Sequence, residues 1–331
     1  MHKQFQDMAF DDEEFLINSL KKNNRKQKLS ADHAAREKAK QKTVKALTAT
    51  RNHDVETAIN HFSYQASRYE GPWLIKSLTE FYENNWINDI TRMIKGGKEA
   101  SVYLCETLNN SWLAAKVYRP RKFRNLRNDG LYREGRENLD EDGNIITNAG
   151  KIYAMRKKST FGKHLSHQSW IKHEFNTMKL LYEAGCDIPQ PFTSGTNSML
   201  MEYIGDESAS APVLQSVRLT HSEAKELAQR VLHNIEIMLA NQRIHGDLSP
   251  FNILIWENNI TLIDFPQSIH PNQNPQSYNI FRRDLEKMDQ YFRLFGVSLD
   301  ADQNAKRLWQ KYNYMHAKDF LYDLPDQLEE E

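Results

Sequence analysis

The 331-residue chain has little cysteine and no long apolar run, and both absences narrow the class of protein. Its two cysteines, Cys105 and Cys186, form no C-x-x-C pair, which argues against a zinc site or a disulfide framework. No stretch approaches the roughly 18 apolar residues of a membrane span. The chain opens with polar and acidic residues, and no apolar segment of a secretory signal follows them. We therefore expect a cytoplasmic protein without a membrane partner.

Net charge is also absent, because 44 Lys and Arg residues balance 44 Asp and Glu residues. This balance argues against a globally basic nucleic-acid binder, although it allows a local basic patch. The 39% hydrophobic content is sufficient for one large domain or for two lobes with cores of their own.

Residues 1–70 contain no glycine or proline, and their apolar residues are too sparse to form a convincing core face. An acidic cluster from Asp11 to Glu14 precedes a tract rich in lysine and arginine. We predict a polar and basic N-terminal extension that is partly helical or disordered. The alternative is an arm that contacts an acidic partner such as RNA.

The rest of the chain reads as strands with one helix, followed by a helix-rich half. The predicted elements are a segment of mixed helical spacing at 73–90, strands near 95–105, 112–118 and 198–204, helices at 170–184, 220–241 and 280–295, and a hairpin at 253–263. Thr220 and Glu223 form a capping-box pattern at the start of one helix. The polar segment at about 119–168 is predicted to be a flexible insertion.

Phosphoryl-transfer chemistry is predicted where His245-Gly246-Asp247-Leu248-Ser249-Pro250-Phe251-Asn252 precedes Ile263-Asp264-Phe265. Such chemistry needs one group that orients the attacking hydroxyl and two groups that hold magnesium. Asp247 suits the first role. Asn252, five positions later as in a kinase catalytic loop, and Asp264 offer the oxygen ligands that Mg²⁺ prefers. Alone, each motif is also compatible with an ordinary turn or strand end, and His245 is predicted to be structural.

A nucleotide site is predicted from residues upstream of this loop. Gly96 and Gly97 form a turn whose N–H groups can approach phosphates, although a plain hairpin would use the same turn. Lys116 lies one strand later, where a kinase lysine contacts the α- and β-phosphates, and Glu174 is the acid predicted to orient it. The alternatives are a solvent-facing lysine and an exposed helix carboxylate. The residues predicted to bind the nucleotide are Gly96, Gly97, Lys98, Glu99, Ser101, Val102, Lys116 and Glu174, together with Met201, Glu202 and Ile204 at the hinge beside adenine.

Asp284 follows two arginines in the helix predicted at 280–295. It is predicted either to anchor the backbone of the catalytic loop or to form a surface ion pair.

Together, these motifs resemble the RIO family of atypical serine/threonine protein kinases over about residues 90–296. Gly97-Lys98-Glu99-Ala100-Ser101-Val102-Tyr103 is similar to the family's G-K-E-A-x-V-Y signature. The stretch from His245 to Asn252 is similar to its H-x-D-L-S-x-x-N loop, and Ile263 to Ser268 is similar to its metal-binding strand end. Ile204-Gly205 with Ala211-Pro212-Val213-Leu214 resembles its I-G…A-P-x-L stretch. Lys95-Gly96 departs from the Ser-Thr of many members.

The resemblance implies an α+β, bilobal, trimmed protein-kinase-like fold, with a small β-rich N-lobe at 71–204 and a helical C-lobe at 205–300. A C-terminal helix and acidic tail would occupy 301–331. It further implies use of ATP with Mg²⁺, or Mn²⁺ in its place, and no conventional activation loop. Asp264 would be the residue that can itself become phosphorylated. The implied substrates are proteins or the chain itself, and the implied partner is the maturing small ribosomal subunit with its rRNA.

Two other functions stay open on the sequence. A small-molecule kinase of the aminoglycoside-phosphotransferase kind shares H-G-D-x-x-x-x-N and I-D-F, but the G-K-E-A-x-V-Y stretch argues against it. A non-catalytic, nucleotide-gated RNA- or ribosome-binding protein would explain the basic N-terminal tract. The complete set of Lys116, Asp247, Asn252 and Asp264 argues against a protein without catalytic activity.

Overall fold

The structure is a computed structural model that describes residues 62–119 and 136–314. The described residues fall into two units, one comprising Phe62 with Thr147–His167, and one comprising the described parts of Ser63–Ile146 and of Gln168–Glu331. Every predicted site residue lies in the second unit. Most of the predicted extension at 1–70 and the tail after residue 314 lie outside the described residues. None of the described helices is long and apolar enough to cross a membrane.

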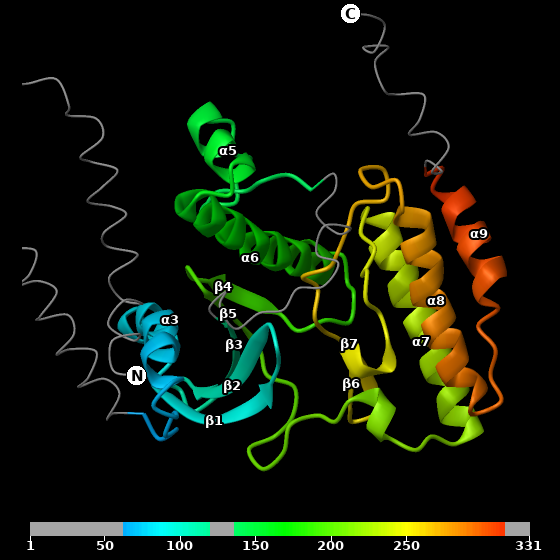
Figure 1. Cartoon of the computed structure of the whole chain (residues 1–331). Helices are drawn as coiled ribbons and strands as arrows, with labels where there is room; N and C mark the ends of the chain where they lie inside the picture. The colour runs from blue at the N-terminus through cyan, green and yellow to red at the C-terminus, as the bar shows by residue number, and fades with distance from the viewer. Residues whose placement is uncertain (1–61, 120–135, 315–331) are drawn as a thin grey trace, which may run out of the picture. The chain divides into compact units, whose positions relative to one another are not determined.

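A five-stranded antiparallel sheet forms the first part of the second unit (Figure 1). Lys116 lies in its third strand along the chain. Its strands are β1 (Asp89–Gly96), β2 (Ala100–Glu106), β3 (Trp112–Tyr118), β4 (Pro191–Ser194) and β5 (Ser198–Glu202), in the order β1-β2-β3-β5-β4. The register pairs Lys116 with Val102 and Ala114 with Met201. Cross-strand partners share a face and side chains alternate along a strand, so Val102, Lys116 and Met201 lie on one face of the sheet.

The turn between β1 and β2 requires glycine at position 97. The Gly97 N–H donates to the Ala100 carbonyl at 2.9 Å. A Cβ at this position would lie 2.7 Å from the same oxygen, closer than any real contact of that kind. The predicted strand–glycine turn–strand order is therefore confirmed, and a side chain at 97 would force the turn open.

The helices of the C-terminal half pack on one another through a shared apolar core. They are α7 (His221–Ala240), α8 (Ser277–Arg293) and α9 (Ala301–Lys311). The predicted capping box starts α7, because Thr220 accepts from the Glu223 N–H and the Glu223 carboxylate accepts from the Thr220 N–H. Helix α8 packs against both α7 and α9 (Figure 1). Its buried face includes Phe281, Leu285 and Met288, as the helical periodicity predicted.

The predicted hairpin forms from β6 (Ile253–Trp256) and β7 (Asn259–Leu262). Its turn residues Glu257 and Asn258 both have positive φ, at +48° and +64°, as in the turns that favour tight hairpins. The 3₁₀ turn Pro250–Asn252 leads directly into β6. The hairpin therefore connects the two halves of the predicted catalytic motif.

The structure corrects several predicted boundaries. The segment predicted at 73–90 divides into α3 (Gly71–Glu83) and β1, and β4 was not predicted. The last 20 or so residues of the predicted insertion are helical, in α5 (Ala149–Arg156) and the start of α6 (Thr160–Glu183). The polar composition of these residues gives no apolar periodicity, so the helix was not predicted. Helix α5 begins with an N-cap, in which the Asn148 side chain accepts from the Lys151 N–H. In the unit that contains Thr147–His167, α5 and the start of α6 lie so close together that a Cβ on Gly162 would be 1.9 Å from the Ala154 carbonyl oxygen.

Candidate active site

The hairpin brings the two predicted metal ligands together. Asn252 immediately precedes β6 and Asp264 lies two residues after β7, at the same open end of the hairpin. The Ile263 N–H donates to the Asn252 carbonyl at 2.9 Å, which holds the two chain segments together at this end. The Asn252 Nδ2 donates to the Asp247 carbonyl at 2.9 Å, so the amide oxygen of Asn252 is not the atom used in this bond. A local β-hairpin thus converts a separation of 12 residues into proximity.

Lys116 lies between two carboxylates. Its Nζ is 2.6 Å from Glu174 Oε1 and 2.7 Å from Asp264 Oδ1. Glu174 is thus paired with Lys116 and is only 1% exposed, so it is not an exposed helix carboxylate. Its role at a nucleotide site stays a prediction. Burial alone lowers the pKa of Lys116, but Asp264 and Glu174 outweigh it and hold the pKa above its usual value. Lys116 is therefore a fixed cation.

Asp264 is held in an unusual backbone conformation. Its φ is +75°, in the left-handed region that costs a non-glycine residue about 1–2 kcal/mol. Burial raises the pKa of Asp264, but Lys116 and then His245 and Lys95 lower it below its usual range. Its side chain is nevertheless 45% exposed, so an ionised carboxylate is presented at the surface of the site. Strain of this kind is characteristic of functional positions.

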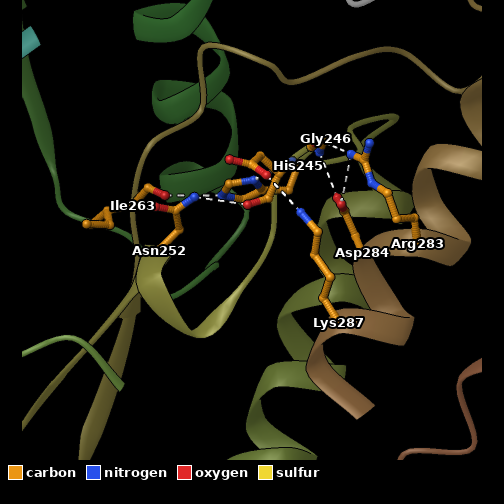
Figure 2. A network of polar contacts seen from close by, with 8 residues as sticks. His245, Gly246, Asn252, Ile263, Arg283, Asp284 and Lys287 are labelled. Atoms are coloured by element: carbon orange, nitrogen blue, oxygen red, sulfur yellow. Dashed lines mark hydrogen bonds and ion pairs between the residues drawn. The ribbon is translucent and has the colours of Figure 1, made fainter. Parts of the chain in front are cut away.

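The catalytic loop is fastened to α8 (Figure 2). Asp284 accepts from the Gly246 N–H at 2.8 Å, and Arg283 donates to the Gly246 carbonyl. Burial raises the pKa of Asp284 to about 7, against the influence of Arg283 and of the backbone N–H groups. Asp284 therefore anchors the loop, which decides between the two roles predicted for it.

Asp247 follows this anchor and carries an ion pair of its own. Its Oδ1 lies 2.8 Å from Lys287 Nζ, and the two side chains are 42% and 34% exposed. Figure 2 shows Lys287 extending from α8 toward the loop. One oxygen of Asp247 is thus engaged by a cation, while the carboxylate remains open to solvent.

His245 is structural, as predicted. Its Nε2 lies 3.1 Å from the Ile263 carbonyl and its ring packs on Phe265 at 4.7 Å between centroids. Burial lowers its pKa to about 4, so the ring is neutral near pH 7 and can donate to that carbonyl. Next to it, Gly246 has φ +84°, and a Cβ there would lie 2.3 Å from the Gln267 carbonyl oxygen. His245 and Gly246 thus fix the path of the loop beside the Asp264 segment.

The residues predicted to bind ATP divide into those on the Lys116 face of the sheet and those in turns. Val102 and Met201 share that face. The Ser101 hydroxyl lies on the opposite face, where it accepts from Arg119 at 3.3 Å, which leaves only the Ser101 backbone for a phosphate. Gly96, Gly97, Lys98 and Glu99 lie in or beside the β1–β2 turn.

The predicted hinge follows β5. The Glu202 N–H donates to the Gln190 carbonyl at 2.8 Å, and the Ile204 carbonyl accepts from Ala211 at 2.9 Å. Within the described ranges no acceptor is recorded for the Ile204 N–H. This N–H is therefore a donor that the hinge can offer to a ligand edge.

Four residues of the site were not predicted. Tyr118 donates to Glu174 Oε2 at 2.6 Å, and Arg136 donates to the Pro266 and Ser268 carbonyls at 3.1 and 2.7 Å. The others are Arg283 and Lys287. Period-two spacing from Lys116 could have found Tyr118, and i, i+3 spacing from Asp284 could have found Lys287. Arg136 gives no such signal because it lies in irregular backbone.

With this geometry established, comparison with known proteins identifies relatives. A profile of the RIO domain matches residues 101–305. The human serine/threonine-protein kinase RIO1 is 27% identical over 214 residues, which are 64% of this chain and 35% of the human protein. The Rio1 kinase of Haloferax volcanii is 27% identical over 215 residues, 63% of this chain and 65% of that protein. The chain thus covers less than two thirds of the length of these relatives.

Among solved structures, the Rio2 kinase–ADP/Mg²⁺–phosphoaspartate complex from Chaetomium thermophilum has a TM-score of 0.51 and 18% identity, and the match covers 79% of this chain and 78% of that one. This similarity shows the fold, and the predicted α+β kinase-like architecture is confirmed. Because the RIO profile spans more than half of the chain, the protein belongs to the RIO family.

Proposed function

We propose that the protein catalyses ATP- and Mg²⁺-dependent phosphoryl transfer, as a RIO-type serine/threonine kinase or ATPase. The observation that carries the proposal is the convergence of Lys116, Glu174 and Asp264 at 2.6–2.7 Å, beside an anchored Asp247 loop. A buried lysine between two acids from distant parts of the chain costs free energy through desolvation of the charges. Such a cluster is therefore not expected unless it serves a function.

The proposed nucleotide site uses the Lys116 face of the sheet. Lys116 stays on Glu174 and exchanges its bond with Asp264 for the α- and β-phosphates. Backbone N–H groups of the β1–β2 turn between Gly96 and Ser101 contact the phosphates, apart from the Gly97 N–H, which donates to the Ala100 carbonyl. The Ile204 N–H meets the adenine edge. Val102 and Met201 flank the adenine as apolar side chains of the same face.

The residues at the open end of the hairpin fit Mg²⁺. Asn252 supplies an amide oxygen and Asp264 a carboxylate of lowered pKa, which are hard oxygen donors. Among the described residues no group of three or more His, Cys, Asp or Glu side chains could form a complete cage. That suits an ion that binds one or two protein ligands and completes its shell with substrate phosphates and water. When bound, the metal supplies charge neutralisation of the phosphates.

Two acceptors fit the geometry. Asp247 can orient a serine or threonine hydroxyl, of a protein substrate or of this chain, for attack on the γ-phosphorus. Alternatively, an Asp264 carboxylate oxygen attacks the γ-phosphorus, the bond to the bridging oxygen breaks, and ADP departs with those electrons. Water then hydrolyses the acyl phosphate, which releases inorganic phosphate and restores the carboxylate. The phosphoaspartate of the solved Rio2 complex supports this second route.

The test is a labelling experiment with γ-labelled ATP and Mg²⁺ on the wild-type protein and on the Asp264→Asn and Asp247→Ala variants. An acyl phosphate is cleaved by hydroxylamine, whereas a phosphoserine ester is not. We expect a hydroxylamine-sensitive label that disappears in Asp264→Asn. Asp247→Ala should lose transfer to hydroxyl acceptors while it retains ATP binding, and chelation of Mg²⁺ should abolish both reactions.

Each result that would contradict the proposal is distinct. A hydroxylamine-resistant label that persists in Asp264→Asn would exclude the acyl-phosphate route and leave an ordinary protein kinase. Rapid transfer to an added aminoglycoside would favour a small-molecule kinase. ATP binding without any turnover would indicate a nucleotide-gated binding protein. A role on the small ribosomal subunit depends on the basic tract within residues 1–70, most of which lies outside the described residues.

A further inference from the structure

The catalytic loop lacks a cation of its own. Residues 247–252 read Asp-Leu-Ser-Pro-Phe-Asn and contain no lysine or arginine. Lys116 is committed to Glu174 and Asp264, the acids of the nucleotide and metal side. A phosphoryl group in transfer spreads negative charge over three oxygens, and catalysis depends on fixed positive charge near them. The acceptor side of the site therefore needs a cation from another element.

Helix α8 provides one. Lys287 Nζ donates to Asp247 Oδ1 at 2.8 Å, and the lysine is one helical turn beyond Asp284. The buried neighbours Leu285 and Met288, each 0% exposed, hold this part of α8 in the core. Asp284 also binds the Gly246 N–H, so loop and helix keep a fixed separation. The backbone of Lys287 is consequently placed by the scaffold within reach of the Asp247 carboxylate.

The exposure of the pair indicates that stability is not its purpose. At 34% and 42% exposure, water screens most of the attraction between Lys287 and Asp247. The same exposure leaves the remaining donors of the ammonium group accessible to a ligand, since a lysine has three. An ion pair of little structural value beside the proposed acceptor site is a candidate for a catalytic role.

We propose that Lys287 is a catalytic residue whose ammonium group contacts the transferred phosphoryl group while it remains beside Asp247. This inference rests on the proposed phosphoryl-transfer function. In the free protein Lys287 is held on Asp247 Oδ1. During transfer it bridges that carboxylate and a non-bridging oxygen of the phosphoryl group. No bond to Lys287 forms or breaks, and its proton stays on Nζ throughout.

The experiment compares Lys287→Met and Lys287→Arg in single-turnover ATP consumption with protein in excess, together with ATP affinity and thermal unfolding. The matched control is Lys306→Met, which removes an exposed lysine on α9 outside the site. We expect Lys287→Met to lower the transfer rate by about 10²-fold, the usual effect of removing one preorganised charge or donor. Lys287→Arg should recover much of that loss. ATP affinity should change little, and the Tm should shift by less than about 3 °C, because the pair is exposed.

Repeating the Lys287→Met substitution in an Asp247→Asn variant distinguishes direct contact with the phosphoryl group from an effect exerted through Asp247. In Asp247→Asn, added Lys287→Met should lower the residual single-turnover rate further. If the double variant matches Asp247→Asn alone, Lys287 acts only through Asp247 and the proposal is overturned. Wild-type rates in Lys287→Met would also overturn it. Chemical rescue provides another check, because alkylation of Lys287→Cys with bromoethylamine restores an amine, and Cys105 and Cys186 are buried. Failure of that rescue would count against the proposal.

The proposed function and this inference fail in different ways. If the wild-type protein consumes no ATP, the proposed function is wrong and Lys287 has no reaction to assist. If the wild-type protein is active and Lys287→Met is equally active, only the role of Lys287 is rejected.

Discussion

Replacing Lys116 with methionine should destabilise the protein as well as inactivate it, and the two effects should be separable. Methionine is an unbranched side chain one atom shorter than lysine, and it lacks the ammonium group. It leaves Glu174, which is 1% exposed, with a buried charge whose remaining partner is the Tyr118 hydroxyl at 2.6 Å. Asp264 loses the same cation, but its side chain is 45% exposed and water can replace the contact.

The magnitude follows from this asymmetry. Breaking a buried ion pair by removing one partner costs about 3–5 kcal/mol, because the other charge stays uncompensated. The exposed contact with Asp264 adds at most about 1 kcal/mol. The total is about 3–6 kcal/mol, and at about 2–4 °C for each kcal/mol in a large domain the Tm should fall by about 6–24 °C.

A second substitution should reverse the loss of stability. Lys116→Met with Glu174→Gln replaces the buried pair by neutral groups of similar shape, and glutamine can still accept from Tyr118. Replacement of a buried ion pair by neutral, well-packed groups is close to neutral in free energy. We expect thermal unfolding without nucleotide to return most of the way to the wild-type Tm, while ATP turnover stays absent.

The assay is thermal unfolding of the wild-type protein, both single variants and the double variant, alongside ATP binding. A wild-type Tm in Lys116→Met would refute the reasoning, because Glu174 would then carry no uncompensated charge. The reasoning would fail equally if the double variant were no more stable than Lys116→Met.

Two further predictions concern the anchor of the catalytic loop. Burial raises the pKa of Asp284 from 3.8 to about 7, so between about pH 4 and pH 7 the folded protein holds a proton that the unfolded chain releases. The free energy of unfolding should therefore fall by up to about 4 kcal/mol as the pH rises through this window. Urea unfolding at several pH values should show a weaker decline for Asp284→Asn than for the wild-type protein. An equal dependence on pH in the two proteins would contradict the assignment to Asp284. Gly246→Ala should destabilise the protein by more than about 2 kcal/mol. The positive φ contributes about 1–2 kcal/mol, and the clash of the new Cβ with the Gln267 carbonyl adds to it. Gly185→Ala is the matched control, since its φ is +81° but its Cβ would meet nothing within 4 Å, and equal costs for the two alanines would rule out the clash.

The sequence alone determined most of the elements that carry the proposed site. Asp247, Asn252 and Asp264 could be proposed from it because local spacing encodes a loop, a hairpin and a strand end, and local signals survive in a single sequence. The same holds for the capping box at Thr220 and for the glycine turn before β2. The helices in 149–168 were missed because polar residues there obscure the apolar periodicity on which the prediction relies.

Only the tertiary structure decided which charges meet. Lys116 and Glu174 are 58 residues apart and Lys287 and Asp247 are 40 apart, separations at which helical or strand periodicity carries no information. Pairing across such distances is set by how the sheet, α6 and α8 pack, and packing depends on the whole core rather than on any one motif. Glu174 could be proposed as the partner of Lys116 because kinases have an acid on the helix that follows the lysine strand. Lys287 could not be proposed as the partner of Asp247 until the structure placed α8 against the loop.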